Sequence, residues 1–168
     1  EKSTKSSEEL KTFDNEIKFS NVSFKYNNEL SIRDVNLVIP KHSSTAIVGE
    51  SGSGKSTLID LLLNFYKLES GSITIDNQNI NLINKYNFRS LFGLVSQNTM
   101  LFNDTITNNI KMGKSNASDK EVEAAAKIAN IDKVIEKLEK GYKTIIGDQG
   151  DNLSGGEKQR ICIARAIV

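Results

Sequence analysis

The chain has 168 residues, enough for one domain and too few for two ordinary ones. Its 22 basic and 21 acidic side chains leave a net charge of +1, which gives no sign of a nucleic-acid partner. A single cysteine, Cys162, excludes an internal disulfide, and no apolar run approaches the roughly 20 residues of a transmembrane helix. We therefore expect one soluble domain, with any membrane-spanning part of the protein lying elsewhere.

The first quarter of the chain predicts a polar linker followed by β-strands. Residues 1–16 are rich in serine and charge, which is the composition of a linker. Between residues 17 and 39 apolar and polar side chains alternate, as they do in strands with one buried face. The alternation slips between Phe19 and Val22, which predicts a bulge or two short strands, and Pro40 ends the last run.

The next fifty residues alternate between short strand patterns and one helical pattern. Residues 45–48 form a continuous apolar run that ends at a glycine, as a buried parallel strand does. Residues 55–66 are apolar on almost every side, which predicts a helix inside an α/β core. Residues 71–76 and 91–95 are expected to form further short strands.

Beyond residue 100 the apolar period becomes helical. Ser118 and Glu121 have the spacing of a capping box and predict the start of one helix. A second helix is expected over residues 131–138, with Gly141 in the position that commonly ends a helix. The last helix is expected to begin at Ser154.

A complete phosphate-loop motif, GESGSGKST, lies between an expected strand and an expected helix. Such a glycine-rich turn exposes consecutive backbone N–H groups, and the helix dipole adds positive charge. Lys55 would reach the β- and γ-phosphates, Ser56 would bind Mg²⁺, and Thr57 would help to hold the remaining oxygens. A plain Gly/Ser turn leaves the lysine unexplained. The nucleotide-binding residues expected here are Gly49, Glu50, Ser51, Gly52, Ser53, Gly54, Lys55, Ser56 and Thr57.

A second motif, LSGGEKQR, spans residues 153–160. Ser154 and Glu157 alone would make a capping box, and the two glycines alone would make a turn. A capped helix start with two glycines is also a competent anion site, so local pattern does not choose between these interpretations.

Together with the phosphate loop, the LSGG core of this octapeptide resembles the signature motif of ATP-binding-cassette (ABC) ATPases. The resemblance implies that Ser154 and Gly156 bind the γ-phosphate of an ATP molecule held by the phosphate loop of a second domain. Gly155 belongs to the same nucleotide-binding set. ATP would then join two such domains head to tail.

Four other positions or segments resemble the family less specifically. Tyr26 stands where the family has an aromatic that stacks on adenine, although a core tyrosine at a strand end is an equal alternative. Gln97 resembles the glutamine that reaches Mg²⁺ and the attacking water. The resemblance therefore implies that Ser56 and Gln97 are the metal ligands and that Lys55 and Gln97 are the catalytic residues. Residues 100–106 resemble the exporter segment that touches the membrane domain, and residues 147–150 resemble a loop used for cross-talk.

The resemblance covers residues 17–168 and is strongest to half-transporter exporters of the lipid-flippase and multidrug type. It implies an α/β fold with a P-loop NTPase (RecA-like) core. An antiparallel β subdomain would lie within residues 17–97 and an α-helical signature subdomain within 98–168, and residues 1–16 would be a linker from a transmembrane domain.

The implied function is MgATP binding and hydrolysis coupled to export of a lipid, drug or other small substrate. The implied partners are a transmembrane domain of the same or a partner chain and a second nucleotide-binding domain, as a homodimer or heterodimer. The domain would lie at the cytoplasmic face of a membrane. The sequence does not identify the transported substrate.

The sequence as given ends at Val168, before the family's segment of four hydrophobic residues, Asp and Glu. The C-terminal part of the core, with the general base, is therefore absent from it, and we expect MgATP binding with very slow turnover. The strand expected over 45–48 would lack its neighbours. The only histidine, His42, is expected to be a surface turn residue, since the family's switch histidine lies far downstream.

Three alternatives compete with the exporter interpretation. A soluble ABC ATPase of DNA repair would need a long coiled coil between the two motifs, and Gln97 and Leu153 are too close in sequence to enclose one. A P-loop kinase would leave LSGGEKQR unexplained. A non-catalytic nucleotide-binding fragment stays open.

Overall fold

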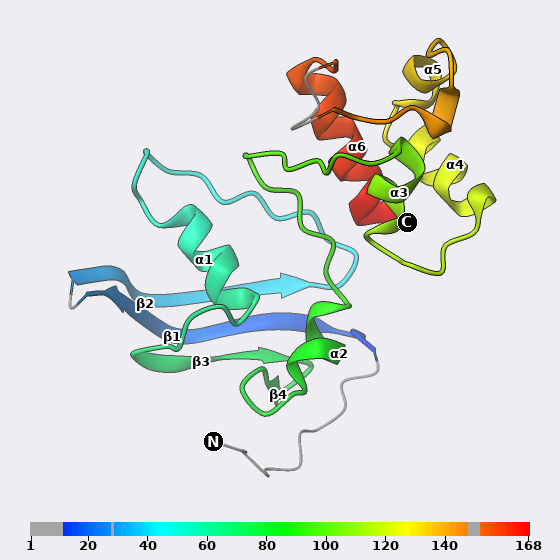
Figure 1. Cartoon of the computed structure of the whole chain (residues 1–168). Helices are drawn as coiled ribbons and strands as arrows, with labels where there is room; N and C mark the ends of the chain where they lie inside the picture. Colours follow the sequence, from blue (N-terminus) through cyan, green and yellow to red (C-terminus); the bar gives the residue numbers. More distant parts are fainter. Residues whose placement is uncertain (1–11, 28, 148–151) are drawn as a thin grey trace, which may run out of the picture. The chain divides into compact units, whose positions relative to one another are not determined.

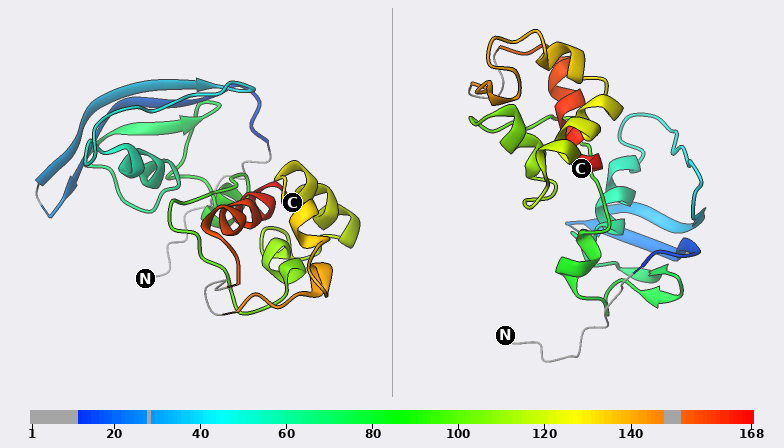
Figure 2. Two further views of the ribbon diagram at one scale, coloured as in Figure 1. Left: turned by 90° about the horizontal axis from the view of Figure 1, so that it is seen from above. Right: turned by 90° about the vertical axis from the view of Figure 1, so that its right-hand side faces the viewer.

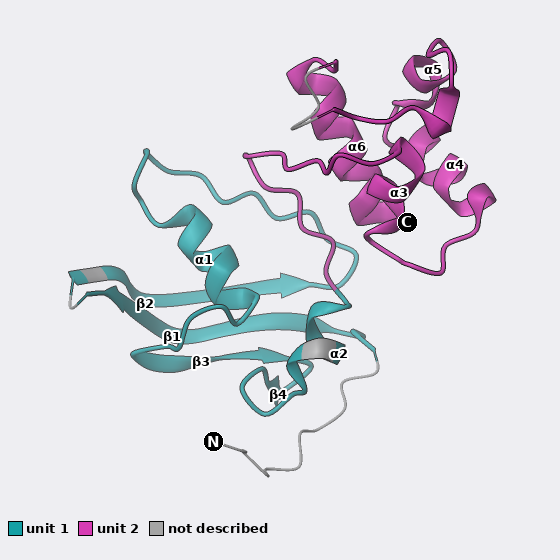
Figure 3. Ribbon diagram, viewed as in Figure 1, with its two compact units in different colours: residues 1–91 teal, residues 92–168 magenta. Residues whose placement is uncertain are grey.

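The computed structural model describes residues 12–27, 29–147 and 152–168. The chain forms two compact units, residues 1–91 and 92–168, which are described separately (Figure 3). Most of the predicted linker and residues 148–150 of the predicted cross-talk loop lie outside the described residues. No helix within the described ranges is long and apolar enough to cross a lipid bilayer.

Unit 1 is built on a four-stranded antiparallel sheet with the strand order β2-β1-β3-β4 (Figure 1). Its strands are β1 (Glu16–Tyr26), β2 (Glu29–Pro40), β3 (Ser70–Ile75) and β4 (Gln78–Asn79), and its helices are α1 (Lys55–Leu62) and α2 (Lys85–Arg89). The predicted slip is confirmed, because the pairing of β1 with β2 shifts register between Phe19 and Val22. Pro40 ends β2 as predicted, and His42 is exposed in the turn that follows.

Two of the predicted strands are absent. Residues 45–48 belong to no strand, and Val48 is 87% exposed, so the prediction of a buried parallel strand was wrong for this structure. A strand persists only where neighbours take up its backbone hydrogen bonds, and no segment of the described part of the chain pairs with 45–48. The strand expected over 91–95 is likewise missing, whereas that expected over 71–76 is confirmed as β3.

Helix α1 lies over the sheet (Figures 1 and 2). It is shorter than the predicted 55–66, because Asn64 adopts a left-handed backbone with φ of +55° just beyond its end. Arg89 pairs with the carbonyls at this helix end, since its guanidinium donates to the Leu63 oxygen at 3.2 Å and to the Asn64 oxygen at 3.1 Å. Its guanidinium also lies 4.9 Å from the ring centre of Phe65.

Asp76, in the turn after β3, ties the start of β1 to the sheet. Its carboxylate accepts hydrogen bonds from the backbone N–H groups of Asp14 at 2.5 Å, Asn15 at 2.8 Å and Glu16 at 2.9 Å. Burial raises the pKa of this carboxyl, but the three amide donors outweigh it and the net pKa lies below the usual value. Lys41 adds an ion pair to Asp14 at 3.2 Å.

Unit 2 is helical. Its elements are α3 (Ile106–Lys111), α4 (Asp119–Ile128), α5 (Asp132–Ile135), the 3₁₀ turn η1 (Gly141–Lys143) and α6 (Gly155–Ile167). Helices α3 and α4 both pack on α6 around a core that includes the fully buried Ile106, Ile110 and Ile161 (Figure 1). Cys162 is buried in the same core, as a small apolar side chain would be.

Both predicted capping boxes are confirmed, at Ser118 before α4 and at Ser154 before α6. The helix expected over 131–138 is only a single α-turn. After Ile135 the backbone tightens, because the amides of Lys137 and Leu138 bond to carbonyls three residues back. Gly141 has a left-handed backbone, with φ of +48°, but it opens η1 rather than ending the longer helix that was predicted.

Candidate nucleotide-binding site

The phosphate loop is shaped by its glycines. Gly54, the N-cap of α1, has φ of +87°, a region that residues with a Cβ rarely adopt. A Cβ on Gly54 would also lie 2.5 Å from Cδ1 of Ile32 and 3.3 Å from the backbone oxygen of Ser31. Glycine therefore allows the left-handed backbone and the close approach of the loop to β2 without strain.

The helix that follows the loop begins without a side-chain cap. No side chain accepts a hydrogen bond at the N-terminus of α1, and its first turn contains no acidic residue. The first N–H groups of a helix have no partner within the helix, and the dipole concentrates positive charge at that end. The start of α1 therefore offers both the donors and the sign of charge that a phosphate requires.

Lys55 adds a full positive charge at the same place. Its Nζ donates to the Gly49 oxygen at 2.9 Å and to the Glu50 oxygen at 2.6 Å, and lies 3.4 Å from Oγ of Ser53. These contacts fold the side chain back across the loop, so the ammonium is held at the loop rather than extended into solvent. The donor set formed by the loop, the helix start and the ammonium fits a polyphosphate.

The expected magnesium ligands come from different units. Ser56 lies in the first turn of α1 in unit 1 with its side chain exposed, while Gln97 lies in an exposed bend of unit 2. Among the described residues there is no group of three or more His, Cys, Asp or Glu side chains able to hold a metal. The residues present thus fit a metal held mainly through phosphate and hydroxyl oxygens rather than one in a protein cage.

Tyr26 lies at the end of β1 in a small aromatic cluster. Its ring is 37% exposed and meets Phe24 edge-on, with the ring centres 4.6 Å apart. Tyr66 completes the cluster, 5.3 Å from Tyr26, and a hydrogen bond with Tyr26 raises the pKa of the Tyr66 hydroxyl. No sequence motif marks Tyr66 as a site residue. The pairing of Ser23 in β1 with Ser70 in β3 brings it there, and that pairing has no local sequence signal.

The signature segment has the geometry of a capping box. Ser154 Oγ accepts from the Glu157 amide at 3.4 Å and donates to the Glu157 carboxylate at 2.8 Å, which also accepts from the Ser154 amide at 2.7 Å. The Ser154 amide and hydroxyl lower the pKa of Glu157. Gly155 and Gly156 are exposed beside the cap. The capping interpretation is thus confirmed, and binding to a second domain's nucleotide stays a prediction.

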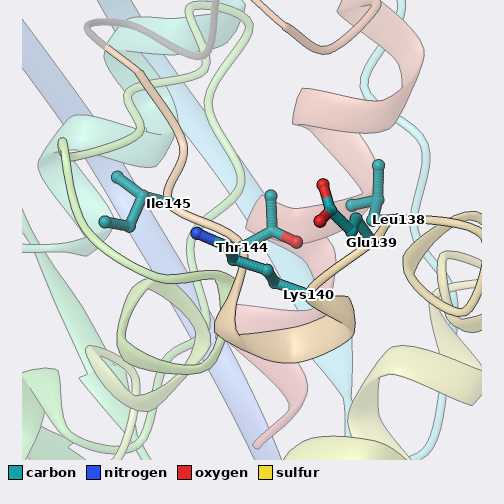
Figure 4. A pocket seen from close by; sticks show the side chains of 5 residues that line it. All are labelled: Leu138, Glu139, Lys140, Thr144 and Ile145. Carbon is teal, nitrogen blue, oxygen red and sulfur yellow. The ribbon is translucent and has the colours of Figure 1, made fainter.

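Described residues of unit 2 line at least two hollows. One, of about 280 Å³, is lined by Asn98, Thr99, Met100, Leu101 and Lys158, and so joins the segment after Gln97 to the signature helix. The other, of about 290 Å³, is lined by Leu138, Glu139, Lys140, Thr144 and Ile145 (Figure 4). It contains none of the predicted site residues.

Comparison with known proteins identifies the family. Residues 32–168 match the family model described as ABC transporter. The chain is 47% identical over 153 residues to ATP-binding cassette sub-family B member 6 of Mus musculus, covering 90% of this chain and 18% of that protein. It is 44% identical over 159 residues to the ATP-dependent lipid A-core flippase of Desulfotalea psychrophila, covering 95% and 28%.

A solved structure agrees with this assignment. The structure of a bacterial Atm1-family ABC exporter with ATP bound superposes with a TM-score of 0.90 at 43% identity, over 94% of this chain and 28% of that one. The fold is thus that of an ABC nucleotide-binding domain. The chain spans under a third of the length of each of these three proteins. Its match over residues 32–168, together with the two phosphate-binding motifs, shows that the chain belongs to the ABC transporter family.

Proposed function

We propose that this chain is the ATP-binding part of a half-transporter exporter, and that MgATP binding and hydrolysis by paired domains drive export of a small substrate across a membrane. The observation that carries the proposal is the phosphate loop. An uncapped helix start, a glycine turn seated on β2 and the Lys55 ammonium all lie at one place, and all favour a polyphosphate.

Each predicted site residue has a role in this proposal. Lys55 and the loop amides would hold the β- and γ-phosphates, and Tyr26 would stack on the base. Ser56 and Gln97 would hold Mg²⁺, which when bound neutralises charge on the phosphates. Ser154, Gly155 and Gly156 would contact the γ-phosphate of the partner domain's nucleotide. Gln97 would also orient the attacking water, with the general base supplied outside residues 1–168.

The segment of residues 100–106, called here the docking segment, is proposed to contact the membrane domain. Its side chains Met100 and Phe102 are 69% and 45% exposed, while Leu101 between them is 4% exposed. Apolar side chains that remain exposed close together can mark a protein contact surface. The domain would then lie on the cytoplasmic side of that membrane.

If each ATP site combines the phosphate loop of one chain with the signature of its partner, the behaviour of mixed dimers of the complete protein can be predicted. In a dimer of one Lys55→Met chain and one Ser154→Ala chain, one of the two ATP sites combines the altered loop of the first chain with the altered signature of the second. The other site combines the intact loop of the Ser154→Ala chain with the intact signature of the Lys55→Met chain. We expect each variant alone to lose ATP turnover, and the mixed pair to regain a clear part of the wild-type rate.

The control is a mixed pair of Lys55→Met with Ser118→Ala, a change in the equivalent capping box of α4 that carries no predicted contact with nucleotide. That pair keeps one chain with both motifs intact. If the first mixed pair stays as inactive as its parents while both variants are folded and paired, the head-to-tail proposal is wrong.

A further inference from the structure

The docking segment is held by a buried side chain that sequence motifs do not mark. Asn109, in α3, is 0% exposed. Its Oδ1 accepts from the Phe102 amide at 2.9 Å, and its Nδ2 donates to the Phe102 oxygen at 2.9 Å and to the Thr105 oxygen at 3.1 Å. A buried side-chain amide that uses both its ends on one loop fixes the backbone of that loop.

Arg165, near the end of α6, binds both Asn109 and the docking segment. Its Nε donates to the Asn109 oxygen at 2.8 Å, its Nη2 to Asn109 Oδ1 at 3.1 Å and its Nη1 to the Met100 oxygen at 2.9 Å. The guanidinium also lies 5.9 Å from the ring centre of Phe102. The planar guanidinium thus donates hydrogen bonds to α3 and to the docking segment at the same time, a geometry that a lysine cannot reproduce.

These contacts decide which side chains the docking segment presents. With the backbone fixed at Met100 and Phe102, Leu101 points into the core of unit 2 while its two neighbours remain exposed. Arg165 and Asn109 therefore determine the orientation of the residues proposed to touch the membrane domain, without themselves being proposed to touch it.

The same helix carries the signature at its other end. Ser154 caps α6, and Arg165 lies ten residues after the first residue of the helix, in its last turn. At 1.5 Å per residue the helix is about 20 Å long, and its buried residues Ile161 and Ala164 pack in the core of unit 2. A packed helix of this length moves as one piece, so a displacement at its capped end is transmitted to its last turn.

We propose that Arg165, together with Asn109, is a positioning residue that fastens the docking segment to α6, so that the signature and the docking segment move as one body. This inference rests on the proposed function, because it assumes that the signature meets nucleotide and that the docking segment meets the membrane domain. In this arrangement Arg165 determines how much transport each hydrolysed ATP yields rather than how tightly ATP binds.

The test uses the complete transporter in liposomes with the Arg165→Lys variant, which keeps the charge and removes the fork. We expect ATP affinity to stay within about twofold of wild type, while transport per ATP falls about fivefold or more, the scale of an ordinary coupling between sites. Parallel loss of ATP turnover and transport, with their ratio unchanged, would assign Arg165 a structural role only and overturn the proposal.

A matched control exists in unit 1. Arg89 also donates to two backbone carbonyls and lies over a phenylalanine ring, but it holds the end of α1 and not the docking segment. Arg89→Lys removes a comparable set of contacts, so it reports the cost of losing such a fork to stability. We expect it to leave transport per ATP unchanged, and an equal fall in both variants would contradict the proposal.

A hydrogen-exchange measurement on the wild-type transporter does not depend on any variant folding. The Phe102 amide, although it lies in a loop, should exchange as slowly as amides of α6, because Asn109 accepts its hydrogen bond. ATP should change the protection of this amide together with that of the first turn of α6. A change at α6 alone would sink the proposal.

The proposed contact between the docking segment and the membrane domain has its own test. The double variant Met100→Ala and Phe102→Ala removes the exposed side chains but leaves Arg165 and Asn109 in place. If transport per ATP is unchanged in this variant, the docking role itself fails. If it falls in this variant but not in Arg165→Lys, docking stands and the positioning role fails.

Discussion

The two helices that carry the phosphate-binding motifs begin in opposite ways. Helix α1 has no side-chain cap and a left-handed glycine at its N-cap, so its first amides have no side-chain acceptor. Helix α6 is closed by its own Ser154–Glu157 box, with distances that match those of the Ser118–Glu121 box at α4 to within 0.1 Å. The phosphate loop is therefore recognisable as a binding site from its local geometry, whereas the signature has the local geometry of an ordinary cap.

This difference explains what each motif needs in order to function. The amides, glycine turn and ammonium of the phosphate loop are assembled within a single unit. The Ser154 hydroxyl already donates its single proton to Glu157, so a phosphate must compete with that carboxylate for it. A site whose hydroxyl is held by its own carboxylate is suited to a partner that supplies several other contacts at once, as a second domain with bound ATP would.

The largest expected effect comes from giving Gly54 a side chain. In Gly54→Ala the positive φ becomes strained and the new Cβ meets Ile32 and Ser31, so the loop must shift. A displacement of about 1 Å in an active site costs on the order of 100-fold in rate, so we expect the ATP turnover of the paired domains to fall by roughly that factor or more, with a fall in ATP affinity measured by calorimetry. Gly52→Ala shares the positive φ but has open space around its Cβ, and should lose less. Equal losses would contradict this explanation.

The next effect tests the ammonium. Lys55→Met should weaken ATP binding by about 2 kcal/mol, or roughly 30-fold, because a charge-assisted hydrogen bond of this kind contributes on that scale. Calorimetric titration of ATP measures it. Lys120→Met, at an exposed lysine of α4, is the control and should leave affinity unchanged. An ATP affinity for Lys55→Met within threefold of wild type would show that the ammonium does not face the phosphates.

A third experiment separates the two equivalent caps. Ser118→Ala and Ser154→Ala should each destabilise their unit by about 1 kcal/mol in urea unfolding, because each loses one helix cap. Only Ser154→Ala should also lower the ATP turnover of the paired domains. If both variants lower turnover equally, the effect at Ser154 reflects stability alone.

The smallest expected effect is the loss of the two capping boxes at low pH. Both box carboxylates have lowered pKa values, so their stabilising bonds are complete above the ordinary glutamate pKa of about 4.3 and are lost as pH falls through the folded value. The hydrogen bond and charge of Lys114, with the two Ser118 donors, bring the pKa of Glu121 to about 2. NMR titration should show the α6 box opening at higher pH than the α4 box. Lys114→Met should raise the pKa of Glu121 and leave the pKa of Glu157 unchanged.

Sequence patterns predicted the elements that depend on near neighbours. Ser118 and Ser154 bond residues three positions away, and the bulge between Phe19 and Val22 appears directly in the alternation. Residues 45–48 failed as a strand, since a strand depends on partners that no local pattern supplies.

The local shape of the phosphate loop followed from its glycines and lysine, because those residue types permit few other conformations. Contacts elsewhere that join segments distant in the sequence did not follow from local patterns. The approach of Tyr66 to Tyr26 depends on sheet register, and that of Arg165 to Met100 depends on tertiary packing between segments 65 positions apart. The roles in nucleotide binding assigned to the predicted site residues stay predictions until nucleotide is added.

The Asp76 carboxylate has a mechanical consequence. A pull along the first strand from its N-terminal end meets three N–H···O bonds to one side chain and, directly behind them, the antiparallel ladder that pairs Ile17 with Ile75. All three bonds end on the same carboxylate, so they share the load. Tension arriving at residue 14 would therefore be passed to the whole sheet before the strand could peel away.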